Sequence, residues 1–216
     1  MSHHILNKTF LTILTIGLIS LIFNCRSLES LSESELNSVS SFDEYRLVIN
    51  YTSIESNLLV FSSDKESYEY LLSAGGETGT TASIREKMDI VRSLLDSTIQ
   101  NTMGMRTHVD NPAGYVSVLI RQAEHHINGG WMAGIVLFGI IPLFMGAPVS
   151  EVSTECEVEV AVFDERKQLL TTLNGKGQST EYMAFYYGYD QYITAAGIIA
   201  LRNALIDARS QMEAAL

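Results

Sequence analysis

Residues 151–163 read EVSTECEVEVAVF, and this stretch decides the fold. Small apolar side chains alternate with glutamates at a period of two, which predicts a β-strand with one buried and one wet face. The buried set is Cys156, Val158, Val160 and Val162, and the wet set is Glu155, Glu157 and Glu159. Cys156 is therefore expected to be a small core residue rather than a reactive thiol. The charged residues 164–167 form a turn, and 168–175 return as the partner strand of a β-hairpin.

Two segments outside this hairpin have the apolar spacing of helices. Residues 191–216 follow Asp190 as a candidate N-cap, and residues 83–103 begin with a capping box of Ser83 and Glu86. The stripe of the C-terminal helix is Thr194, Ile198, Leu201, Leu205, Ala208 and Met212. Alternating patterns predict further strands at 44–53 and 115–123. We therefore expect an α+β fold, a mostly antiparallel sheet with two helices packed on one face and an apolar insert between strands.

The insert, residues 131–149, reads WMAGIVLFGIIPLFMGAPV and carries no charge over nineteen residues. This length is almost that of a membrane-spanning helix. Pro142 and three glycines interrupt the run and no Lys or Arg flanks it, so a simple span is disfavoured. A hairpin bent near Pro142 would return both ends to the same side. Three interpretations stay open: burial against the sheet or a partner subunit, which we favour, a loop in or on a membrane, and a true span.

The N-terminus has the pattern of an export signal. Residues 9–23 form an uncharged run of fifteen residues, short for a spanning helix, and Cys25 follows almost directly. Residues 21–25, LIFNC, resemble a bacterial lipobox, in which the cysteine is acylated and becomes the new N-terminus. Phe23 and Asn24 are bulkier than the small residues that the strict lipobox has before its cysteine. They resemble the looser lipobox of spirochaete lipoproteins, in which larger residues occur at these positions. An uncleaved anchor helix and an ordinary secretory signal stay open as alternatives.

The signal and its surroundings suggest three parts: a lipoprotein signal peptide at 1–24, a Ser/Glu-rich tether at 25–42, and a single α+β domain at 43–216. The layout resembles that of small envelope lipoproteins of Gram-negative and spirochaete bacteria. The resemblance implies that Cys25 is the lipidation site and that its acyl chains hold the protein on a membrane. Arg26 follows the cysteine, where lipoproteins retained in the inner membrane carry an acidic residue. In this position the chain resembles lipoproteins that are sorted to the outer membrane. The resemblance carries over no catalytic residue.

Composition excludes one large class of partner. The chain has 14 Lys and Arg against 25 Asp and Glu, a net charge of −11. No basic stripe is visible, and a phosphate backbone is bound through clustered Lys and Arg, so we expect no nucleic acid partner. If Cys25 is acylated, Cys156 is the only other cysteine, and the mature chain forms no internal disulfide.

Motifs for catalysis, cofactors and metals are not found in the sequence. Residues 75–81, GGETGTT, lack the lysine of a phosphate-binding loop. His125 and His126 follow Glu124, but neighbouring side chains on a strand point to opposite faces and do not readily ligate one ion. We therefore predict no catalytic, cofactor-binding or metal-binding residues.

We therefore expect a membrane-anchored envelope lipoprotein that acts as a binding or assembly module without catalysis. Its membrane contact is the acylated Cys25, and a protein partner or a second copy binds through 131–149. One alternative is an oligomeric membrane-inserting subunit that uses the 131–149 segment. Another is an envelope ligand-binding protein or enzyme that uses the tyrosine-rich residues 182–192 with His125 or His126.

Overall fold

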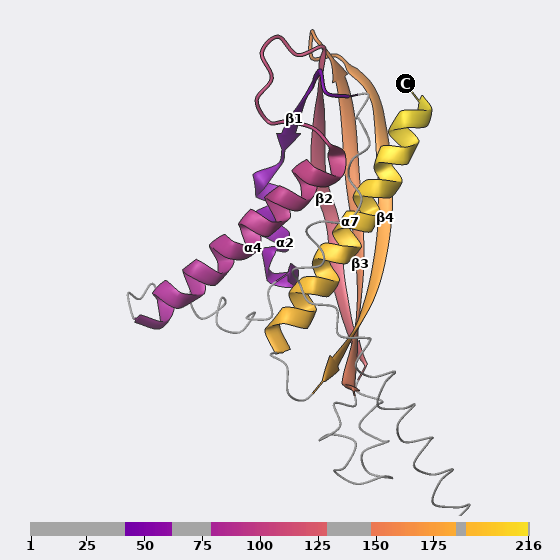
Figure 1. Ribbon diagram of the computed structural model, residues 1–216. Coiled ribbons are helices and arrows are strands. Elements are labelled where there is room, and N and C mark those ends of the chain that lie inside the picture. Colours follow the sequence, from indigo (N-terminus) through magenta and orange to yellow (C-terminus); the bar gives the residue numbers. More distant parts are fainter. Residues whose placement is uncertain (1–41, 62–78, 129–147, 185–188, 216) are drawn as a thin grey trace, which may run out of the picture.

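The computed structural model describes residues 42–61, 79–128, 148–184 and 189–215 (Figure 1). The described elements follow in the order β1 (Tyr45–Ile49), α2 (Tyr51–Phe61), α4 (Gly79–Met103), β2 (Gly114–Asn128), β3 (Pro148–Asp164), β4 (Leu169–Ala184) and α7 (Tyr189–Ala215). These helices and strands form an α+β fold, as the sequence predicts. The proposed signal and tether, with Cys25, and residues 131–147 of the insert lie outside the described residues.

The strands form a mixed sheet rather than a mostly antiparallel one. Its order is β1-β2-β3-β4, in which β2, β3 and β4 are antiparallel neighbours and β1 runs parallel to β2. The parallel pair of β1 and β2 accounts for the difference from the predicted sheet. Between these two strands the chain passes through α2 and α4 before it returns to the sheet. Such a crossover brings the next strand back in the same direction.

The hairpin of β3 and β4 confirms the strand prediction and extends it. Asp164 closes the turn, because its Oδ1 accepts hydrogen bonds from the backbone N–H groups of Arg166 and Gln168 at 2.9 and 2.7 Å. Residues 148 and 149, which we assigned to the insert, belong to β3. The buried Ser150 and Val152 continue the alternation of β3 past residue 151, and the long apolar run conceals this boundary in the sequence.

Helix α7 lies unusually close to β4. A Cβ atom on Gly177 would overlap the backbone of Ala200 and Ala204, and one on Gly175 would lie 2.8 Å from the Cβ of Ala208. The three alanines are fully buried and four residues apart, so they form one face of the helix. Five members of the predicted stripe are buried as expected: Ile198, Leu201, Leu205, Ala208 and Met212. Thr194 is half-buried and its hydroxyl donates to Phe61 O at 2.9 Å. The helix begins at Tyr189, so Asp190 lies inside it and is not its N-cap.

Three polar side chains of α7 also bind the backbone of β4, which is an edge strand of the sheet. Asn203 donates to Gln178 O at 2.8 Å, Asp207 accepts from Lys176 N at 3.0 Å, and Gln211 donates to Asn174 O at 3.0 Å. These groups would otherwise be available to pair with another strand. The helix therefore closes this stretch of the sheet edge.

Residues 51–61 form helix α2, and our assignment of 51–53 to a strand was wrong. The N–H of Asn50 donates to Val118 O at 3.0 Å, which ends the pairing with β2. The side chain of Asn50 then accepts from the N–H of Ser53 at 3.1 Å, as an N-cap does. Tyr51 matches the period of the strand before it, but the cap at Asn50 overrides this pattern.

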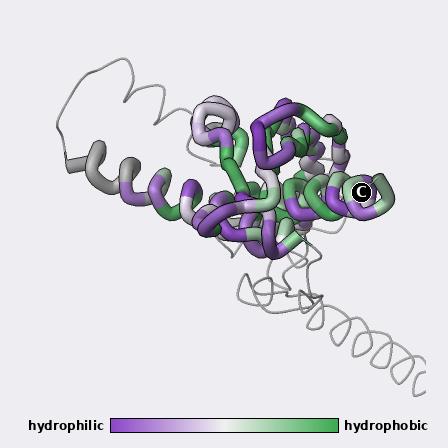
Figure 2. Tube along the Cα trace, turned by 90° about the horizontal axis from the view of Figure 1, so that it is seen from above, coloured by the Kyte–Doolittle hydropathy of each residue, from purple (hydrophilic) through white to green (hydrophobic). Residues whose placement is uncertain are grey.

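Helix α4 begins at Gly79, so Ser83 lies inside the helix and is not its cap. The helix ends at Met103 as predicted, because Gly104 adopts a left-handed φ of 66° and its N–H bonds Gln100 O at 2.9 Å. The N-terminal half of α4 extends away from the sheet, as both views show (Figures 1 and 2). With α2, which we did not predict as a helix, three described helices lie on the covered side, where we expected two.

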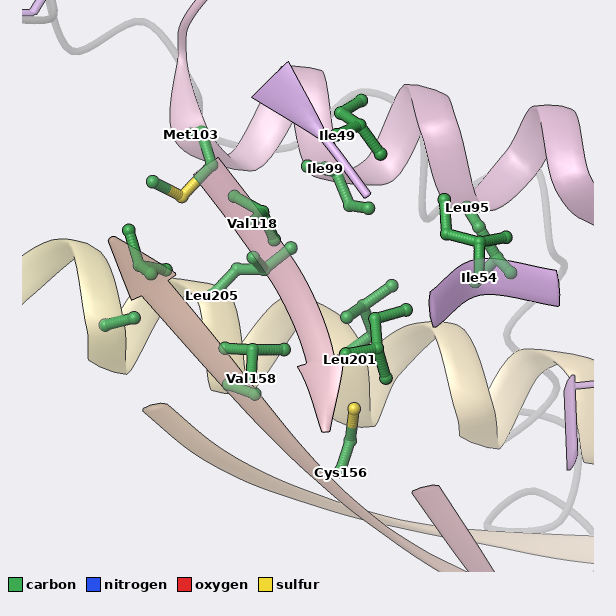
Figure 3. Close-up of a cluster of buried hydrophobic side chains, with 14 of the residues drawn as sticks. Ile49, Ile54, Leu95, Ile99, Met103, Val118, Cys156, Val158, Leu201 and Leu205 are labelled. Atoms are coloured by element: carbon green, nitrogen blue, oxygen red, sulfur yellow. The ribbon is translucent and has the colours of Figure 1, made fainter. Parts of the chain in front are cut away.

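The core lies between the sheet and the three described helices. Figure 3 shows side chains from strands and helices pointing toward one another in this layer. Leu95, Ile99 and Met103 of α4 meet Leu201 and Leu205 of α7, and all five are fully buried. Val118, Cys156 and Val158 close the layer from the sheet. The alternation of residues 155–163 therefore identifies the buried face correctly.

Candidate functional site

The two faces of the sheet differ sharply. The covered face packs on α2, α4 and α7, and the opposite face, here the outer face, carries the alternate side chains of each strand. On β3 the outer residues are Glu151, Ser153, Glu155, Glu157, Glu159, Ala161 and Phe163. Polar and acidic groups therefore occupy much of this face, and apolar ones gather toward Phe163.

Several of the outer glutamates have partners on the neighbouring strands. Glu159 accepts from Arg121 Nε of β2 at 2.8 Å, and Glu157 lies 3.9 Å from Lys176 Nζ of β4. Gln178 donates to Glu155 at 3.2 Å. Such exposed pairs contribute little to stability, so they mainly order the side chains on the face.

An irregularity of β2 at Arg121 decides where the two histidines point. Ile120 pairs with Val158, but Gln122 pairs with Glu157, so β2 carries one extra residue there. The insertion reverses the alternation, as a β-bulge does. His125 therefore points to the covered face and His126 to the outer face, which confirms that the two side chains lie on opposite faces of the sheet.

His125 connects the sheet to the end of α2. Its Nδ1 lies 2.6 Å from Thr154 Oγ1, and its Nε2 hydrogen-bonds the carbonyl oxygen of Val60. Burial lowers the pKa of His125. The hydrogen bond to the Val60 carbonyl raises this pKa by a smaller amount, and the nearby His126 lowers it further. Among the described residues no three His, Cys, Asp or Glu side chains gather as a metal site would require.

Cys156 occupies the core position that its alternation predicts. It is 3% exposed, and burial raises the pKa of its thiol to about 12. A thiol with so high a pKa is protonated at neutral pH and is a poor nucleophile. Its role in the described structure is packing.

The tyrosine-rich residues do not form one described surface. Tyr182 lies on the outer face of β4 and is 51% exposed, whereas Tyr192 of α7 packs on the covered side against Val152 and Ile193. Residues 185–188, with two further tyrosines, lie outside the described residues. The sheet therefore separates Tyr182 from Tyr192, two of the tyrosines that the ligand-binding alternative would bring together.

The long strands give the sheet two distinct ends. At the Gly114 end, Gly114 pairs with Tyr45 and Asp164, and the described chain begins nearby at Phe42, whose ring meets that of Tyr45 at 5.7 Å. At the Asn128 end, Asn128 pairs with Glu151. The described strands on either side of the apolar insert, β2 and β3, meet at this second end. Fourteen residues of β2 separate the two ends, or about 45 Å.

Comparisons with known proteins add little to this geometry. No protein-family model and no curated protein matches the chain. Among solved structures, a crystal structure of a candidate lipoprotein from Caulobacter crescentus is similar over 57% of this chain and 78% of that chain. The identity is 12% and the TM-score 0.33, which is too low to carry an argument. Among the described helices, none is both long and apolar enough to cross a membrane.

Proposed function

We propose that this protein is an envelope lipoprotein held on a membrane, the outer membrane in our assignment, by acyl chains on Cys25. Its folded domain serves as a binding or assembly module and performs no catalysis. A protein partner, or a second copy of the chain, binds at the Asn128 end through residues 131–149.

The observation that carries this proposal is the separation of the two ends of the sheet. The tether reaches the domain at Phe42, beside the Gly114 end, and the insert leaves and returns at the Asn128 end. The strands that flank the insert therefore end about 45 Å from the end of the sheet that the tether reaches. An apolar segment held there is suited to contact another protein rather than the anchoring bilayer.

The described strands also limit how the insert can be used. Asn128 and Glu151 are directly paired, so the insert leaves and re-enters the sheet at neighbouring positions. A single crossing would place these paired strands on opposite sides of a membrane. A contact loop or a returning hairpin is compatible with the pairing.

The anchor is tested by mass spectrometry of the mature N-terminus. We expect an acylated Cys25 and a membrane-bound protein, and we expect Cys25→Ser to abolish acylation. A mature chain that starts after Cys25, or that keeps Met1, contradicts the anchor.

The binding role is tested on the same protein by sedimentation in detergent solution. We expect an oligomer or a partner complex that dissociates when Ile140 and Phe144 are changed to serine. The matched control is Ile206→Ser, since Ile206 is an apolar side chain of α7 that is already 46% exposed. Unchanged assembly in the insert variant, or equal loss in the control, would contradict this use of the insert.

A further inference from the structure

One row of residues crosses the outer face at the Gly114 end. The backbone pairs Arg106 with Arg46, Arg46 with Tyr115, Tyr115 with Phe163, and Phe163 with Leu169. Residues paired in this way share one face of a sheet. Two guanidinium groups therefore lie beside a strip of aromatic and aliphatic side chains.

The two arginines have no ionic partner among the described residues. Arg46 Nε donates to Thr107 O at 3.0 Å, which orients the guanidinium and leaves its terminal nitrogens for another acceptor. Arg106 is exposed, and Leu47 N binds its backbone oxygen at 2.9 Å. Two like charges in direct register repel one another unless an anion lies between or above them.

A third cation is held over the same row by a strained turn. Lys167 adopts a left-handed φ of 61°, which is uncommon for a residue with a side chain. Its N–H donates to Asp164 O at 3.0 Å, and its Nζ lies 5.7 Å from the centre of the Tyr115 ring. The turn therefore keeps this ammonium group on the outer face rather than leaving it free.

Exposed apolar side chains surround these cations. Val48 is 43% exposed, Leu169 58% and Leu170 52%. Cationic groups interleaved with apolar ones suit the boundary between lipid headgroups and acyl chains. The same end also carries the cation Arg166 and five acidic residues, Asp43, Glu44, Asp110, Asp164 and Glu165. Its net charge is therefore slightly negative, and attraction to an anionic headgroup depends on the local row of cations.

We propose that this row docks on the phosphate headgroups of the bilayer that holds the acylated Cys25. The proposal rests on the proposed function, because it assumes the acyl anchor. Phe42 lies at the same end of the sheet, and the seventeen residues from Cys25 to Phe42 have a coil span of only about 20–25 Å. The tether therefore holds the Gly114 end near headgroups, where the arginines gain anionic acceptors.

The test uses the lipidated full-length protein in vesicles of phosphatidylcholine and phosphatidylglycerol. A fluorescent probe is attached to Leu169→Cys, and the matched probe to Tyr182→Cys at the Asn128 end, since Cys156 is buried. A quencher attached to the lipid headgroups should quench the probe at 169 and leave the probe at 182 bright. Changing both Arg46 and Arg106 to glutamine should lower the ratio of docked to free protein by about thirtyfold.

Lysines at both positions should restore docking, whereas a purely structural role of the arginines would not allow this rescue. Equal quenching at 169 and 182, or quenching unchanged in the glutamine variant, would overturn the docking proposal. Acylation of Cys25 is measured on the same samples by mass spectrometry. An acylated protein whose probe at 169 stays bright disproves the docking alone, and a chain without acyl groups disproves the proposed function.

Discussion

At the scale of single residues, one extra residue in β2 determines which histidine enters the covered layer. Without the bulge at Arg121, the alternation of Val116, Val118 and Ile120 would continue to even-numbered positions and His126 would point inward. The sequence alone predicts that the two histidines point to opposite faces. It does not predict which one is inside, because no local signal marks the bulge.

The inward position makes the free energy of unfolding depend on His125 and on pH. Burial lowers the pKa of folded His125 below its usual 6.5, so the unfolded chain binds the proton more tightly. The stabilisation by neutral His125 is complete above pH 6.5 and is lost as the pH falls through the lowered folded-state pKa. Urea unfolding at about pH 7.5 and about pH 5 should show this loss, and His125→Gln should reduce it. His126→Gln is the control and should keep the wild-type loss; an equal effect of both variants would contradict the assignment.

A second prediction concerns Gly177, where the close approach of α7 leaves no room for a side chain. Gly177→Ala would place a methyl group against the backbone of Ala200 and Ala204, and backbone cannot move as a flexible side chain does. We expect the free energy of unfolding to fall by about 3 kcal/mol. Thr172→Ala on the exposed outer face of the same strand is the control and should change it little. A loss of similar size in both variants would show that the contact is not the cause.

At the scale of elements, alternation and helical spacing locate β3, β4 and α7 because one face of each element is buried and the other is wet. The same reasoning fails for α2, where an N-cap at Asn50 interrupts an apparent strand. It also misses the start of β3, since residues 148 and 149 continue an apolar run that began in the insert. Capping contacts and long-range pairing decide these boundaries, and neither is visible in local hydrophobicity.

The closure of the β4 edge by α7 gives a prediction at this scale. Asp207 accepts a hydrogen bond from the backbone N–H of Lys176, and Asp207→Ala removes it. We expect the free energy of unfolding to fall by about 1–2 kcal/mol, because a backbone N–H then loses a charged acceptor. The amide of Lys176 should also exchange its hydrogen faster. Asp207→Asn keeps an acceptor oxygen and should preserve most of the protection; unchanged exchange in the alanine variant would contradict this account.

At the scale of the whole molecule, the strands of the sheet determine where the insert joins the domain, and the residues of the insert itself do not. The sequence identifies 131–149 as an apolar segment between strands, but it does not tell how far that segment lies from the tether. The length of β2 sets the distance between the two ends of the sheet at which the described chain meets these segments, and β2 continues past the predicted residue 123 to Asn128. The row at the Gly114 end was missed for a similar reason, because Arg46, Arg106 and Tyr115 meet only through strand pairing.

This geometry leads to a prediction about the tether. At full extension the seventeen residues from Cys25 to Phe42 span about 55–60 Å, enough to let the Asn128 end also reach the bilayer. Deleting residues 29–38 leaves about 25 Å, too little for a domain about 45 Å long to turn over. The single tryptophan, Trp131, reports on the insert. In vesicles whose acyl chains carry a quencher, we expect Trp131 to stay bright with either tether.

A variant with Trp131→Phe and Leu28→Trp places the tryptophan three residues from Cys25, the proposed acylation site, and should be quenched, which shows that the measurement works. Strong quenching of Trp131 with the full tether, lost when residues 29–38 are deleted, would mean that the domain lies along the bilayer and dips its insert into it. The insert would then be a second membrane contact, and the alternative of a membrane-inserting subunit would replace the protein-binding role. Bright Trp131 in both proteins agrees with an insert that stays away from the anchoring membrane, because shortening the tether then removes no contact between the insert and the bilayer.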